Sequence, residues 1–230
     1  MRRQRGFTLI EIAIVLVIIG LLLGGVLKGQ ELITSARVRN LISQQDGIKA
    51  AYFGFLDRFR ALPGDYTQAS ANINCTPACS NGNGNGQITQ AGVSGATIDE
   101  HIAVWEHLSK AGFVNGSYTY VAGAETATSA AANPYIRYIR VIYDTNYGGA
   151  GSNIRHNVKT GNQVPSDIMA EIDRKIDDGN PLGGNFQFST YDGGGTGGTP
   201  PDPATCYTAG TPPLWSAATV VTNCGGASLL

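Results

Sequence analysis

The sequence predicts an α+β fold in which one long N-terminal helix is followed by a loop-rich head with short strands. Three observations favour this class. An apolar run continues directly into an amphipathic stretch that reaches Ala61, segments rich in β-branched and aromatic residues follow, and many of the 31 glycines are bunched in between. A length of 230 residues suits a small domain carrying one extended element.

The first part of the predicted helix has the length and composition of a membrane span. Residues 7–27 contain a single charged side chain, that of Glu11. A helix of about 21 residues is roughly 30 Å long, which matches the hydrocarbon core of a bilayer. A signal peptide would end in a small-residue cleavage site, which is absent after Leu27. A plain signal anchor leaves the costly carboxylate of Glu11 unexplained.

The second part of the predicted helix, residues 28–61, is amphipathic. Its apolar side chains recur at helical spacing, namely Leu41, Ile48, Tyr52, Phe55, Leu56 and Phe59. Pro63 restricts the residue before it and therefore stops the helix. We expect residues 62–230 to form the head.

A basic leader with Arg2, Arg3 and Arg5 precedes Gly6-Phe7-Thr8-Leu9-Ile10-Glu11, and the apolar span follows at once. This N-terminal segment resembles the processing site of type IV prepilins and type II secretion pseudopilins. The resemblance implies that a membrane peptidase cuts after Gly6, removes residues 1–6 and methylates Phe7. It also implies that Glu11 pairs with the new α-amine of a neighbouring subunit, because a buried carboxylate is unfavourable without a partner.

The same resemblance extends to the fold and to helix packing. It implies that the long helix packs on a small antiparallel sheet in a disulfide-bonded head. Gly20 and Gly24 form a small-xxx-small pattern that lets helices approach closely, and we interpret them as helix-packing residues. Glycine lowers helix propensity by about 1 kcal/mol relative to alanine, so this stretch is also the place where the helix can loosen.

Four cysteines indicate an oxidising compartment. Cys75, Cys79, Cys206 and Cys224 lie in polar loops, and an even count there favours two disulfides. Their spacings match no compact zinc signature. The family resemblance implies a bridge between Cys206 and Cys224, with Cys75–Cys79 as the second pair, whereas the residues alone leave all three pairings open.

Two short helices and three strands are predicted in the head. A capping box at Thr97–Glu100 begins one helix, which ends near Gly112, and Ser166 or Asp167 begins the other. Strands are expected at Ser117–Val121, Tyr135–Tyr143 and Asn185–Ser189. His101 and His107 are six residues apart on the first helix, so they point to different sides and are expected at the surface.

Three segments raise the question of a ligand. Residues 81–92 have the oxygen-rich alternation of a calcium loop but lack carboxylates, so a solvated turn is the first interpretation and calcium the alternative. The acids of Asp177–Pro181 suit either a cation or a helix-ending turn. Tyr135–Arg140 interleaves aromatics with arginine, which favours a packing face over a nucleic-acid clamp, because residues 7–230 carry 13 basic against 17 acidic side chains.

No catalytic motif or cofactor fingerprint is present, so the sequence predicts a structural protein and not an enzyme. The resemblance implies a subunit of a type IV pilus or pseudopilus, with its length favouring a minor pilin or pseudopilin. Its partners would be other pilin-like subunits, the prepilin peptidase and methyltransferase, the inner-membrane assembly platform and the lipid bilayer, with no nucleic acid. The subunit would wait in the bacterial inner membrane with its head outside the cytoplasm, then enter a periplasmic or extracellular filament. A pilus-displayed adhesin or DNA-uptake receptor is the alternative.

Overall fold

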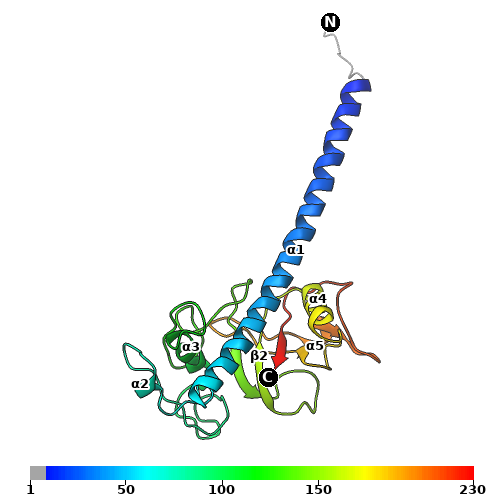
Figure 1. Ribbon diagram of the computed structural model, residues 1–230. Helices are drawn as coiled ribbons and strands as arrows, with labels where there is room; N and C mark the ends of the chain where they lie inside the picture. The colour runs from blue at the N-terminus through cyan, green and yellow to red at the C-terminus, as the bar shows by residue number, and fades with distance from the viewer. Residues whose placement is uncertain (1–8) are drawn as a thin grey trace. The chain divides into compact units, whose positions relative to one another are not determined.

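The computed structural model describes residues 9–230 (Figure 1). The chain divides into two compact units, one ending at Val38 and the other formed by Arg39–Leu230. Helix α1, Leu9–Phe59, contributes to both. Among the described residues it is the one helix long and apolar enough to cross a membrane, judged by length and composition. The predicted long helix is therefore confirmed, and it ends shortly before Pro63.

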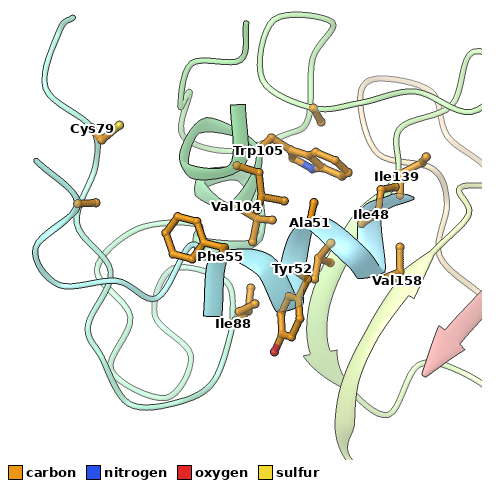
Figure 2. Packing of buried hydrophobic residues seen from close by; sticks show 14 of the residues in the cluster. Ile48, Ala51, Tyr52, Phe55, Cys79, Ile88, Val104, Trp105, Ile139 and Val158 are labelled. Atoms are coloured by element: carbon orange, nitrogen blue, oxygen red, sulfur yellow. The ribbon is translucent and has the colours of Figure 1, made fainter. Parts of the chain in front are cut away.

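Within the second unit, the amphipathic part of α1 supplies the centre of the core. Leu41, Ile48, Tyr52 and Phe55 are buried, as their helical spacing predicted. Figure 2 shows Phe55 and its neighbours on α1 facing side chains of helix α3, with Val158 of the sheet at the other end of the cluster. Burial of each large apolar side chain contributes about 1.5–3 kcal/mol, so this stripe fixes α1 on the head.

The head contains a small antiparallel sheet, as expected. Its strand order is β1-β2-β6-β3, and every pair is antiparallel. The strands are β1 (Arg140–Asp144), β2 (Arg155–Lys159), β3 (Phe186–Phe188) and β6 (Gly226–Leu229). A second sheet pairs β4 (Tyr207–Thr208) with β5 (Leu214–Trp215).

The predicted strand segments are only partly confirmed. Tyr135–Tyr143 contains most of β1 but begins as a turn, and Asn185–Ser189 contains β3. Ser117–Val121 forms no strand; Tyr118 and Tyr120 donate backbone N–H groups to side chains of α3, so no ladder can form there.

Four short helices complete the head. They are α2 (Ala69–Asn72), α3 (Glu100–Lys110), α4 (Ser166–Ile176) and α5 (Pro203–Cys206). Helices α3 and α4 lie where the sequence predicted them, but the capping box does not form. Asp99 is the N-cap of α3 and makes no side-chain capping bond. Glu100 instead turns inward and accepts hydrogen bonds from the backbone of Asn83 and Thr89.

The expectation that His101 and His107 lie at the surface is wrong. Their exposed fractions are 1% and 0%, because loops cover α3 on both sides. Nδ1 of His107 accepts from the N–H of Gly64 at 2.9 Å, and Nε2 lies 2.7 Å from the carbonyl oxygen of Ser80. Burial lowers the pKa of His107, so the ring is neutral and links two loops.

Both expected disulfides are present. Cys75 pairs with Cys79, and Cys206 pairs with Cys224 at a Cα–Cα distance of 5.7 Å. The second bridge joins residues 18 positions apart and is fully buried. A loop of that size contributes about 3 kcal/mol in the chain-entropy model. The C-terminal segment, rich in glycine and proline, is thereby held beside the start of α4, because Val164, two residues before that helix, pairs with Cys224.

Candidate functional site

The N-terminal part of α1 is the segment that the sequence marked for processing and assembly. Gly6 and Phe7 lie outside the described residues. Glu11 lies in the first turn of α1, on a helix whose apolar side chains are exposed along the whole span, with Leu9 at 90%. Apolar surface of this extent is stable only in lipid or against other apolar helices.

Gly20 and Gly24 lie within this exposed span. A Cβ atom added at either position would meet no atom within 4 Å. No contact inside the first unit therefore requires glycine there, although each lowers helix propensity by about 1 kcal/mol relative to alanine. Their role as helix-packing residues stays a prediction. Close approach of a second helix would explain why glycine occupies both positions.

In the head, the loop considered for calcium is built around a carboxylate. Asp65 Oδ1 accepts from the backbone N–H groups of Gly84 (2.6 Å) and Asn85 (3.1 Å), and its Oδ2 accepts from that of Gly86 (2.8 Å). Gly84 and Gly86 have φ angles of +72° and +81°, which favour glycine. The loop thus presents positive N–H dipoles inward, the polarity that suits an anion.

The side-chain oxygens of the same loop are also engaged. Oδ1 of Asn83 accepts from the N–H of Asn85 at 3.0 Å, and Oδ1 of Asn85 accepts from that of Gln87 at 2.8 Å. These are Asx turns, in which asparagine oxygens hold their own backbone. The alternation of Asn and Gly is therefore explained by these turns, without a bound calcium ion.

The one group of three or more potential metal ligands within residues 9–230 lies at the C-terminal end of α4. Carboxylate oxygens of Asp173, Asp177 and Asp178 lie within 4.8 Å of one another. Each acid also accepts a hydrogen bond: Asp173 from Nε1 of Trp215 (2.7 Å), Asp177 from the N–H of Phe186 (2.7 Å) and Asp178 from that of Asn180 (2.9 Å). The arrangement ends the helix, as the turn interpretation predicted, and it also connects the helix to β3 and β5.

Asp173 should make the head less stable as pH rises from about 4 to 6. Burial, followed by the nearby Asp178 and Asp177 charges, raises its pKa to about 6 against hydrogen bonds that oppose the shift. The folded state therefore binds a proton that the unfolded state has released, and stability falls over that window. Asp173→Asn keeps an acceptor for Trp215 and should gain up to about 2 kcal/mol on the wild type between pH 4 and 7.

Urea unfolding at pH 4, 5, 6 and 7, followed by tryptophan fluorescence, measures this difference. Asp178→Asn is the matched control, since its carboxylate is more exposed and its removal should shift the profile only slightly. A difference between Asp173→Asn and the wild type that is constant with pH would contradict the raised pKa.

A second buried charged group was missed by the sequence analysis. The guanidinium of Arg140 binds both carboxylate oxygens of Glu125, with Nη2–Oε2 at 2.8 Å, and lies 4.2 Å from the ring centroid of Tyr191. Glu125 is fully buried. Burial tends to raise the pKa of Glu125, but the hydrogen bonds and charge of Arg140 lower it overall, so the pair is ionised.

His101 completes this group as a neutral ring. Its Nε2 lies 3.5 Å from Oε1 of Glu125. Burial and then the positive charge of Arg140 lower its pKa to about 4. Arg140 is thus held in an internal ion pair and packs inward, whereas the packing-face interpretation expected its arginines to be exposed.

Comparison with known proteins gives one match, and it lies in the N-terminal segment. Residues 1–27 match the prokaryotic N-terminal methylation motif. No curated protein and no solved structure matches the chain. The matched residues contain Gly6, Phe7 and Glu11 at the predicted spacing, and they run into the exposed apolar part of α1. The chain therefore carries the prepilin-type cleavage and methylation segment of type IV pilins and pseudopilins.

Proposed function

We propose that this protein is a structural subunit of a type IV pilus or type II secretion pseudopilus and acts without enzymatic activity or a cofactor. The observation that carries the proposal is the methylation motif at residues 1–27 joined to an exposed apolar helix. Before assembly the helix would anchor the subunit in the inner membrane. In the filament, apolar helices of neighbouring subunits would replace lipid around it.

Glu11 would act as the assembly residue in this proposal. It is the only charge between Leu9 and Leu27, and a carboxylate moved from lipid headgroups into an apolar filament core needs a cationic partner. The α-amine created by cleavage before Phe7 supplies such a charge. The partners are then other pilin-like subunits, the prepilin peptidase and the assembly platform.

The head supports a building block more directly than a displayed receptor. Its buried Arg140 is held by Glu125, and the acids after α4 are used in turns. A polar groove of about 540 Å³, lined by Tyr147, Arg155 and Gln187 among others, is the feature that would serve the alternative, an adhesin or DNA-uptake receptor. Loss of adhesion or DNA uptake with filaments intact, on Arg155→Ala, would favour that alternative.

Mass spectrometry of the protein from its native membranes tests the proposal. We expect a chain that begins at N-methylated Phe7, and filaments that contain it. Glu11→Ala should still be cleaved but should enter filaments at least tenfold less, whereas Glu31→Ala, an exposed acid further along α1, should assemble normally. A chain that keeps Met1, or one cut after Leu27, would overturn the proposal.

A further inference from the structure

Two residues of the second unit, Arg39–Leu230, lower the stability of the isolated subunit without an explanation inside it. Ile136 is a β-branched residue with φ +62° and is 84% exposed. Gly47 lies in the interior of helix α1, where an added Cβ would meet no atom within 4 Å. Left-handed backbone is unfavourable for isoleucine, and glycine weakens a helix. Costs of this kind persist where they serve a contact.

The turn that carries Ile136 is held rigidly. Oδ1 of Asn133 accepts from the N–H groups of Tyr135 (2.8 Å) and Arg137 (3.0 Å), on the two sides of Ile136. Its Nδ2 donates to the carbonyl oxygen of Thr160 at 2.9 Å, which ties the turn to the end of β2. Asn133 itself is buried. The aliphatic side chain of Ile136 is thus fixed outward by a network that overrides its backbone preference.

Gly47 lies at a groove of about 380 Å³ between α1 and α3. Ile48 and Trp105, both buried, are among its lining residues, and Figure 2 shows them on α1 and α3 of the same cluster. The remaining lining residues include Phe113, Val114, Tyr118 and Ala131. A side chain at position 47 would extend over this apolar space, whereas glycine leaves it open.

We propose that Ile136 of one copy of this chain seats in the Gly47 groove of the next copy. The groove is larger than one aliphatic side chain and has apolar lining residues beside the polar Gln44 and Asn115, and Ile136 is the most exposed large apolar residue of the head. The flanking charges are opposite in sign, since half-buried Arg137 follows the isoleucine and exposed Asp46 precedes the glycine. A contact between two different patches repeats from subunit to subunit and builds an open helical array.

This inference rests on the proposed filament function and adds to it. It implies that copies of this protein occupy consecutive positions in the filament. It also assigns a contact between their second units that is separate from the packing of the apolar helices. It also explains both unfavourable features. The left-handed backbone of Ile136 and the helical Gly47 each lower the stability of the isolated subunit, and the contact between Ile136 and the groove offsets that loss.

Single-cysteine cross-linking in filaments tests the contact. One tagged copy carries Ile136→Cys, and another carries Asn115→Cys at the groove. Because the described chain has no free cysteine, a disulfide between copies can form only between these two introduced cysteines or between two copies of the same one. We expect a cross-linked dimer under mild oxidation only when both variants are present. Val93→Cys, an exposed apolar position on another loop, replaces Ile136→Cys in the control and should give none.

A second measurement separates folding from contact. Ile136→Asn suits the left-handed backbone and should raise the melting temperature of the full chain in detergent by about 2–4 °C, while incorporation into filaments falls at least fivefold. Ile136→Val keeps both strain and apolar surface and should change neither. Filaments that assemble without cross-links and tolerate Ile136→Asn would overturn this inference and leave the proposed function standing. Absence of filaments altogether would overturn both.

Discussion

Replacing Glu125 with alanine is expected to destabilise the head by about 3–5 kcal/mol, because it leaves the guanidinium of Arg140 buried without its partner. Glu125 is fully buried and its two oxygens are both bonded to Arg140. Chemical unfolding of the full chain in detergent, followed by tryptophan fluorescence, measures the loss. A subunit weakened to this extent should also reach filaments in smaller amounts, since the total stability of a domain is only about 5–15 kcal/mol.

Two variants make this result specific to the ion pair. Glu125→Gln keeps an acceptor for Arg140 and should lose less than alanine does. Arg140→Met removes the charge but keeps the long apolar stem, so it leaves Glu125 buried without its partner and should also be strongly destabilising. The pKa of Glu125 is lowered in the folded state, so its contribution is present above the ordinary glutamate pKa and is lost as pH falls through the lowered value. A loss below about 1 kcal/mol for Glu125→Ala would show that water reaches Arg140.

The features that depend on local pattern could be predicted from the sequence. The long helix follows from an apolar run joined to a stripe at helical spacing, and the buried Ile48, Tyr52 and Phe55 confirm that stripe. Helix α4 was predicted from Ile168, Ile172 and Ile176 as its inward side chains; the first two are buried, whereas Ile176 is exposed. The processing segment could be predicted because Gly6, Phe7 and Glu11 are identified by their fixed spacing along the chain. That spacing can be recognised without knowledge of the fold.

The features that depend on distant partners could not be predicted. Strand β2 is Arg155–Lys159, a polar stretch without β-branched alternation, and it forms because β1 and β6 pair with it on both sides. Strand β6 begins at Gly226, whose lack of a side chain admits the ring of Phe186. Glu125 and Arg140 are 15 positions apart in separate segments, so neither pattern nor spacing indicated the pair.

Asp65 is the second position at which one substitution should have a large effect. Asp65→Ala removes the acceptor of three backbone N–H groups, from Gly84, Asn85 and Gly86. Hydrogen bonds to a charged group contribute about 1.5–3 kcal/mol each, and hydration of this exposed loop returns part of that, so we expect a loss of about 3 kcal/mol. Burial raises the pKa of Asp65 above its ordinary value, and the hydrogen bonds from Gly86, Gly84 and Asn85 oppose that shift and so favour the ionised carboxylate.

Comparison of Asp65→Ala with Asp65→Asn, with and without calcium, identifies what the loop holds. Asparagine keeps one acceptor oxygen but turns an NH₂ donor towards backbone donors, so it should lose at least half as much stability as alanine does. If the loop is organised by its carboxylate, millimolar calcium should leave the melting temperature of the wild type unchanged, because N–H dipoles repel a cation. If the loop binds calcium, the ion should raise the melting temperature of the wild type and fail to raise that of Asp65→Ala. The inward direction of three N–H groups favours the first outcome, and it explains why a sequence that alternates oxygen side chains with glycine does not require a metal.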